Sequence, residues 1–422
     1  MTKEFFAENR KKLLDRLDLQ NESGVILFSG LPRRRTADED NPFWASRDFV
    51  YLTGLEQEDL VWFAWKKNGK LTETVFVPAA DPRAERWTGR MLHTEQIEPI
   101  SGISVIKERK LFDRILRDAL YASVSPTLYL DFDPPSYGIC DEPAQKLATE
   151  LKRDYPFCAV KNCHPVLMRM RAVKRPEELE QLMASIAATK DGILAMLKAV
   201  KPGMYEYQLR GIFEATLADK GLRVPSFPTI VGAGKNSLVM HYPEQDCRIE
   251  DGDIILADLG AQFGFCGADI TRVFPANGHF TERQKLLHDM ARDNADYLLG
   301  VMKPGMTFEE AARIGDEELL PKLKALGLAE ELKDVRKYRW HSRSHHLGFD
   351  VHDDCDYDMP FMPGMVITME VGLYIEDWGE GVRVEDDFLF TEDGCVNLSV
   401  DIPRTTEDIE AIMAAGKAAR EQ

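Results

Sequence analysis

The sequence predicts a two-domain protein of the mixed α/β (α+β) class, and three observations lead to this prediction. The chain has 422 residues, which exceeds the size at which a single hydrophobic core usually stops growing. Residues 1–165 alternate short apolar runs with helical stretches, as a mixed α/β domain does. Strands and glycine turns dominate residues 227–398. We therefore place the domains at residues 1–168 and 169–422.

The first domain is expected to open with an amphipathic helix and to contain a mixed sheet. Phe6, Leu13, Leu14 and Leu17 recur at helical spacing in a start that is otherwise charged. Residues 108–122 are helical in pattern. Four apolar runs are typical of strands: GVILFSG, LVWFAWK, ETVFVPAA and TLYLDFD.

Three helices are predicted in the second domain. The first begins at Pro176, because proline is favoured at the first helical position and two acidic residues follow it, and it runs toward Val200. The second, YEYQLRGIFEATLADKG, ends at Gly221. The third lies in TERQKLLHDMARDNADYLLGVM, and strands joined by glycine turns occupy most of the remainder.

The charge of the chain argues against two classes of partner. Aspartate and glutamate number 71 against 53 lysines and arginines, which gives a formal net charge of −18 at pH 7. Nucleic acid and anionic membranes bind basic protein faces. We therefore expect neither nucleic acid nor a membrane as a partner.

The N-terminal stretch and the cysteines predict a cytoplasmic protein. The start, MTKEFFAENRKKLLDRLDLQ, lacks the apolar core of a signal peptide. No stretch approaches the ~20 apolar residues of a membrane span. Seven cysteines are scattered without CxxC pairs, which suits free thiols in a reducing compartment.

Two aspartates fall in or beside apolar strand runs in DLGAQFGFCGADITRVF. If a two-residue turn forms at Phe263–Gly264, Asp258 and Asp269 stand opposite each other with Cβ atoms ~5 Å apart. Two carboxylates so placed repel each other, and one must stay protonated unless a cation neutralises them. The alternative is that one or both lie at a frayed strand end and face water. Between them, Cys266 is interpreted as a buried, inert thiol.

A second predicted hairpin carries another acid pair. The strands GMVITMEVGLYI and GVRVEDDFLFT are joined by the polar loop EDWGE. Centring the loop on Asp377–Trp378 places Glu370 opposite Glu385, although a bulge would shift this register. Four carboxylates on two hairpins are hard to explain as structure. Two divalent ions that share bridging carboxylates explain them.

Histidines supply candidate nitrogen ligands. The tract HSRSHHLGFDVHDD contains four of the nine histidines, namely His341, His345, His346 and His352. Any one of them alone fits a core or surface histidine better than a ligand. Their clustering beside glycine, between the two acid hairpins, brings the ligand interpretation level with the structural one, and both stay open at this point. His241, in NSLVMHYPEQD, carries no signal of its own.

Taken together, these segments resemble the active-site blocks of the pita-bread metallopeptidases. The similar blocks are DLGAQFGFCGADITRVFP, SHHLGFDVHD, TMEVGLYI and GVRVEDDFLFT. DFVYLTG, RWTGR and NLS resemble the Xaa-Pro aminopeptidase (aminopeptidase P) branch. The resemblance implies an N-terminal, creatinase-like mixed α/β domain for oligomerisation or substrate access. A catalytic pita-bread domain, with a curved antiparallel sheet covered by helices, would follow it.

The resemblance also implies five ligands of a dinuclear metal site: Asp258, Asp269, His345, Glu370 and Glu385. Asp269 and Glu385 would bridge the ions, Asp258 would bind one ion, and His345 and Glu370 the other. The family pattern selects His345 rather than His346, because His345 follows a serine.

Five further positions match residues that act on substrate in the family. His241 and His352 match histidines that hydrogen-bond substrate and intermediate. His341, Tyr374 and Arg383 fall where the family places substrate-binding residues.

The expected reaction is hydrolysis of the N-terminal X-Pro bond of peptides with proline second. Four oxygen donors and one imidazole favour Mn²⁺, Co²⁺, Fe²⁺ or Zn²⁺, and the resemblance implies two Mn²⁺. A hydroxide shared by the ions is the expected nucleophile. Glu370 would take its proton and pass it to the leaving proline nitrogen. His352 and His241 would stabilise the charge on the tetrahedral intermediate.

Three residues depart from the family pattern. Val371 replaces the proline of Glu-Pro-Gly, His346 stands where an aromatic residue or glycine is usual, and Arg343 is bulky for its loop. No ligand is lost, so these departures bear on the shape of the pocket and on the substrate range.

Rival functions exist within the same fold. A prolidase cleaves only X-Pro dipeptides, and RWTGR with the long N-terminal domain favours the aminopeptidase over it. A metal-free, creatinase-like hydrolase is disfavoured because all five ligands are present. A non-enzymatic scaffold is disfavoured because no ligand is lost. We expect a dimer or tetramer, in which Trp44 and the arginines of LPRRRTADEDNPFW reach a neighbour's site or cap their own domain.

Overall fold

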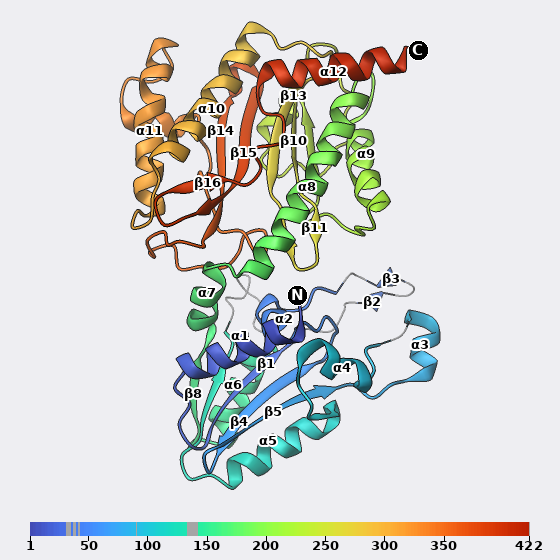
Figure 1. Cartoon of the computed structure of the whole chain (residues 1–422), viewed down its shortest axis with the longest axis vertical. Coiled ribbons are helices and arrows are strands. Elements are labelled where there is room, and N and C mark those ends of the chain that lie inside the picture. The colour runs from blue at the N-terminus through green and yellow to red at the C-terminus, as the bar shows by residue number, and fades with distance from the viewer. Residues whose placement is uncertain (31–34, 37–38, 41–42, 90, 133–141, 422) are drawn as a thin grey trace. The chain divides into compact units, whose positions relative to one another are not determined.

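In a computed structural model, the chain forms two compact units, Met1–Met170 and Arg171–Gln422 (Figure 1). The structure describes residues 1–421 without 31–34, 37–38, 41–42, 90 and 133–141, so most of the arginine-rich segment before Trp44 lies outside the described residues. Among the residues described, no helix combines the length and the apolar content that crossing a membrane requires.

The first unit is built on a six-stranded mixed sheet with the strand order β6-β5-β4-β1-β7-β8. The central strands β1, β4 and β5 are antiparallel, and β6, β7 and β8 add to them in parallel. The four apolar runs predicted as strands are confirmed as β1, β4, β5 and β7. The strands are β1 (Ser23–Phe28), β4 (Val61–Lys67), β5 (Lys70–Val77), β6 (Ile106–Glu108), β7 (Thr127–Leu130) and β8 (Ala159–Asn162), with a separate pair β2 (Arg35–Thr36) and β3 (Glu39–Asp40).

Helices cover this sheet and bury its apolar side chains. Phe112 and Leu116 of α5 and Leu151 of α6 share a core with Ile26 and Phe63 of the sheet. The start of the chain forms the predicted amphipathic helix α1, which packs against α2 and α4. The helices are α1 (Lys3–Arg16), α2 (Arg47–Thr53), α3 (Pro82–Thr88), α4 (Thr94–Ser101), η1 (Arg109–Leu111), α5 (Phe112–Tyr121), α6 (Pro143–Asp154) and α7 (His164–Ala172).

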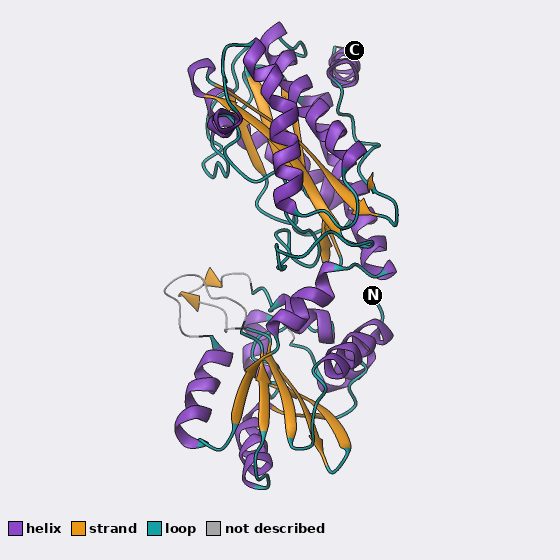
Figure 2. Cartoon of the chain, turned by 90° about the vertical axis from the view of Figure 1, so that its left-hand side faces the viewer, coloured by secondary structure: helices purple, strands orange, loops and turns teal. Residues whose placement is uncertain are grey.

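The strand pairs described in the second unit are all antiparallel. Two three-stranded sheets have the orders β13-β10-β9 and β14-β15-β16, and β13 lies beside β15, so the two sheets adjoin. Figure 2 shows helices of this unit lying over its strands. The strands are β9 (Ile230–Ala233), β10 (Ile254–Leu259), β11 (Gln262–Phe263), β12 (Cys266–Gly267), β13 (Ile270–Pro275), β14 (Val366–Ile375), β15 (Glu380–Phe390) and β16 (Cys395–Asn397).

The three helices predicted in this unit are confirmed as α8, α9 and α10, and two more are present. Leu298 of α10 and Leu319 of α11 belong to one core with Val371 and Val384 of the long hairpin. Helix α10 packs against β14 and β15, which carry two of the acids, and α11 packs against α10. The helical segments are α8 (Pro176–Ala199), α9 (Glu206–Asp219), η2 (Gly234–Leu238), α10 (Glu282–Val301), α11 (Phe308–Ala325), η3 (Leu332–Lys337), η4 (Glu376–Trp378) and α12 (Thr406–Arg420).

The structure confirms the predicted register of one acid hairpin and contradicts that of the other. Glu370 pairs with Glu385 as predicted. The predicted pairing of Asp258 with Asp269 is wrong, because Asp258 pairs with Thr271 and the turn lies at Gly264–Phe265. This shift of two residues leaves both aspartates on one face of the hairpin, because side chains alternate along a strand.

Candidate metal centre

Four carboxylates converge where the two sheets of the second unit adjoin. Asp258 lies on β10, Asp269 directly precedes β13, and Glu370 and Glu385 lie on β14 and β15. Ligand atoms of Asp258, Asp269 and Glu385 lie within 4.8 Å of one another, and so do those of His345, Glu370 and Glu385. Glu385 belongs to both groups, and Asp269 also lies in a third group with His345 and His352, so either carboxylate could contact two ions.

The electrostatics of this cluster fit divalent cations. Burial and the neighbouring acids raise the pKa of Glu385 well above its usual range. Burial raises the pKa of Asp258 to about 7 and that of Glu370 to about 7. Asp258 Oδ1 is buried and has no hydrogen-bond partner among the described residues. Because these oxygens repel one another and one lacks a donor, cations would satisfy them better than protons do.

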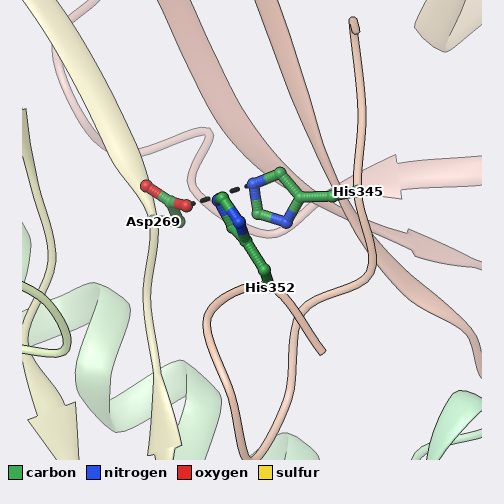
Figure 3. Close-up of side chains that lie close together, drawn as sticks. All are labelled: Asp269, His345 and His352. Atoms are coloured by element: carbon green, nitrogen blue, oxygen red, sulfur yellow. Dashed lines mark ion pairs between the residues drawn. The ribbon is translucent and has the colours of Figure 1, made fainter. Parts of the chain in front are cut away.

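His345 presents one ring nitrogen to the carboxylates. Its Nε2 lies 3.3 Å from Asp269 Oδ2 and 3.9 Å from Glu370 Oε1. Its Nδ1 donates to the carbonyl of His346 at 2.9 Å, which fixes the ring with Nε2 directed at the acids. Figure 3 shows Asp269 and the rings of His345 and His352 directed at one another, and the two ring centroids are 4.2 Å apart.

Arg383 forms hydrogen bonds to side chains of the carboxylate cluster. Its guanidinium donates to Asp258 Oδ2 at 2.6 Å, to the hydroxyl of Tyr374 at 2.9 Å and to Thr271 Oγ1 at 3.0 Å. Thr271 in turn donates to Glu385 Oε2 at 2.6 Å. Arg383 is buried, and its hydrogen bonds are to residues of the site. These bonds orient Asp258 directly and Glu385 through Thr271.

His341 and Tyr374 lie next to Glu370 and Arg383 in the cluster. His341 Nε2 lies 2.9 Å from the Tyr374 hydroxyl, and its Nδ1 lies 3.3 Å from Glu370 Oε2. Burial lowers the pKa of His341 to about 3, so the ring is neutral. Trp340 stacks on Tyr374 with ring centroids 5.0 Å apart. Gly372 permits this arrangement, because a Cβ there would lie 2.5 Å from His341 Nε2.

A cavity of about 500 Å³ opens beside the carboxylates. His241 and His352 line it together with Asp258 and Asp269, so the two predicted histidines reach the same space as the acids. The rest of its wall combines an apolar part with polar and charged side chains. The apolar part comes from Phe227, Pro228, Ile230, Tyr242, Pro243 and Val351, and the polar part from Arg210, Glu214, Thr229 and Gln245.

The three departures from the family pattern lie behind the site. The ring of His346 packs on Phe308 with centroids 5.2 Å apart. Arg343 reaches between two helices, where its Nη1 donates to Asp316 at 2.6 Å. Val371 is buried in the core under the long hairpin. None of these three side chains lines the cavity.

Sequence reasoning missed Thr271 and Asp353. Thr271 could have been found, because it stands two residues after Asp269 on the same strand face. Asp353 follows His352 and binds Arg171 at 2.5 Å and Lys174 at 2.6 Å. These partners are so distant in sequence that no local pattern indicates them.

Models of known families match both units. The model of metallopeptidase family M24 matches residues 180–392, and that of the aminopeptidase P N-terminal domain matches residues 6–129. The Xaa-Pro aminopeptidase of Escherichia coli (strain K12) is 30% identical over 443 residues, which cover 99% of both chains. The chain belongs to metallopeptidase family M24.

Other M24 relatives divide between two peptidase types. Human Xaa-Pro aminopeptidase 3 is 29% identical, and the match covers 96% of this chain and 85% of the relative. Human Xaa-Pro dipeptidase is 28% identical, with 97% and 93% covered.

Solved structures agree with this M24 assignment along the whole chain. A provisionally assigned aminopeptidase P from Bacillus anthracis has a TM-score of 0.94 at 37% identity, with 99% of both chains covered. Aminopeptidase P of E. coli with the inhibitor Pro-Leu has a TM-score of 0.90 at 29% identity, again with 99% covered. These relatives confirm the predicted fold class, the resemblance to Xaa-Pro aminopeptidases and the assignment as a metal-dependent hydrolase.

Proposed function

We propose that this M24 chain hydrolyses the N-terminal X-Pro bond of peptides whose second residue is proline. In this proposal, the two divalent ions are held by five ligands: Asp258, Asp269, His345, Glu370 and Glu385. The observation that carries it is the convergence of four carboxylates and one imidazole nitrogen, with Glu385 in two groups of ligand atoms. The whole-length similarity to the E. coli Xaa-Pro aminopeptidase supports the choice of substrate.

The donor set favours Mn²⁺ as the metal, with Co²⁺, Zn²⁺ and Fe²⁺ as alternatives. When bound, the two ions supply a water molecule activated near neutral pH and polarise the scissile carbonyl. A solved structure of Zn-substituted E. coli aminopeptidase P in complex with product, which resembles this chain with a TM-score of 0.89, supports divalent metals at such a site.

The side chains divide the remaining work. Glu370 lies between His341 and His345, from where its carboxylate takes a proton and delivers it to the departing proline nitrogen. His241 and His352 line the cavity beside the acids, so they donate hydrogen bonds to the oxygen on which charge develops. His341 and Tyr374 bind the substrate, and Arg383 orients Asp258 and also belongs to the predicted substrate-binding set.

The proposal extends to the rest of the chain. Residues 1–168 would serve oligomerisation or substrate access, in a dimer or tetramer. The scattered cysteines favour the cytoplasm as the compartment. An X-Pro dipeptidase is the second candidate, because the human Xaa-Pro dipeptidase also matches 97% of this chain.

A matched pair of substrates tests the proposal. Protein stripped of metal with a chelator is given an X-Pro dipeptide or an X-Pro-Y tripeptide, with and without Mn²⁺. We expect Mn²⁺-dependent release of X from the tripeptide. Cleavage of the dipeptide alone would move the assignment to the dipeptidase, and no cleavage of either would refute proline-directed hydrolysis.

A further inference from the structure

The tract 338–345 carries His341 to the site without regular secondary structure of its own. It lies between η3 and β14 and is neither helix nor strand. Its backbone is tied to β14 at three points: Tyr374 N donates to Tyr338 O, Glu370 N to Arg343 O, and Thr368 N to His345 O. Between the first two of these bonds, the residues around His341 need another anchor to hold the ring beside Glu370.

Asp316 of α11 supplies that anchor through two arginines of the tract. Arg339 donates to both of its carboxylate oxygens, at 2.9 and 3.1 Å, and Arg343 donates to Oδ1 at 2.6 Å. Arg339 also donates to the carbonyl of His341 at 2.7 Å. One buried carboxylate therefore holds the chain on both sides of His341.

The neighbouring helices are shaped to receive Arg343. Its Nε donates to Asn294 Oδ1 of α10 at 3.2 Å. Gly315 of α11 leaves room for the guanidinium, because a Cβ there would lie 2.6 Å from Arg343 Nε. Arg343 and Asp316 are 2% and 5% exposed, so the pair is shielded from water and its geometry is restricted.

Stability alone explains this arrangement poorly. Burying an ion pair costs desolvation energy, and apolar side chains of similar volume often stabilise a protein as well or better. Arg343 Nη2 is buried without a partner among the described residues, which adds to that cost. A buried ionic contact does, however, fix one geometry.

We propose that Asp316, with Arg339 and Arg343, is a positioning clamp that sets His341 against the substrate. In the part of the chain that the structure describes, the side chains of the clamp contact no side chain of a proposed ligand and do not line the cavity. The role of the clamp rests on the proposed function in one respect, namely that His341 binds the substrate. Loosening it would weaken substrate binding and leave the metal ligands in place.

The test compares two clamp variants with a control on the same helix. Arg343→Met removes the guanidinium and leaves Asp316 paired with Arg339, so it should fold. Asp316→Asn weakens both pairs. Glu317→Gln, at the next position, removes an exposed carboxylate that binds Arg313 and should behave as the wild type. The readouts are KM and kcat for an X-Pro-Y tripeptide with Mn²⁺, bound metal, and hydrogen exchange of residues 338–345.

For Arg343→Met we expect KM to rise about tenfold while kcat changes less than about twofold. Amide exchange in 338–345 should accelerate, and bound metal should not change. A purely structural role would lower Tm and leave KM and local exchange as in the wild type, and that result would overturn the clamp. If the wild type cleaves no tripeptide, the proposed function fails instead, and the exchange data alone decide the clamp.

Discussion

Thr271 connects the two halves of the carboxylate cluster. Its hydroxyl accepts from Arg383 and donates to Glu385, while Arg383 also binds Asp258. Donors therefore hold two of the four buried acids, Asp258 through Arg383 and Glu385 through Thr271. Partners of this kind orient metal ligands and tune their affinity.

We expect Thr271→Val, which keeps the shape and removes the hydroxyl, to weaken Mn²⁺ binding by about 10- to 100-fold. Glu385 Oε2 would lose its donor and Arg383 one acceptor. Calorimetric titration of the metal-stripped protein measures the effect. Thr216→Val is the control, because Thr216 bonds only within its own helix α9. Equal Mn²⁺ affinity in both variants and the wild type would show that Thr271 does not orient the ligand.

The two hairpins show what a register argument can and cannot predict. The register of the long hairpin was predicted correctly for two reasons. The polar loop between its strands indicates where the turn lies, and β14 and β15 pair without a bulge. The pairing register of the first hairpin was predicted two residues away from the observed one. Gly264 can occupy either the first or the second position of a two-residue turn, and the prediction chose the second. Gly264 has φ of 63° and takes the first turn position, which glycine prefers in one common hairpin turn. Both aspartates still lie on the predicted face of the hairpin, because a register shift of two residues leaves every side chain on the same face.

Helix α11 shows why part of the support for the site was not predicted. Its start was readable, because Thr307 and Glu310 form a capping box. Gly315 and Pro321 within it argue against a helix in sequence. Gly315 leaves room for the guanidinium of Arg343. This contact joins two segments that are apart in the sequence, so no local pattern reveals it. The proposed ligands could be named from spacing and resemblance, whereas the side chains that orient them depend on tertiary packing.

In the first unit, His164 at the start of α7 joins two other elements. Its Nδ1 lies 3.1 Å from Asp48 of α2 and 2.9 Å from Asp131, which follows β7. Burial alone would lower the pKa of His164, but the bonds and charges of the two aspartates raise it to about 11 from 6.5. A raised pKa means that the folded state holds the proton more tightly than the unfolded state.

The stabilisation from His164 should therefore be complete below pH 6.5 and decline as the pH rises toward 11. We expect His164→Gln to reduce the free energy of unfolding at pH 6 much more than at pH 10. Guanidinium denaturation of the full chain at several pH values measures this. His93→Gln is the control within the same unit. A loss for His164→Gln that is the same at every pH would contradict the charged interaction.

At the scale of the whole molecule, the chain is acidic and its candidate metal centre is a cluster of carboxylates. The net charge of −18 and the cluster of acids both favour metal cations over anionic partners. Both units match their family models, and the catalytic proposal places all five ligands in the second unit alone. The proposed chemistry thus depends on the hairpins and the histidine tract of that unit.

The central claim is that two ions occupy this site and are needed together. Its most direct test is a titration of chelator-stripped protein with Mn²⁺, in which bound metal and tripeptide cleavage are followed in parallel. We predict two bound ions per chain in the wild type and, because Glu385 is one of the two proposed bridging ligands, loss of both high-affinity ions and of cleavage in Glu385→Ala. Wild-type protein that reaches full activity with one ion, or a Glu385→Ala variant that keeps both ions, would rule out the proposed dinuclear site.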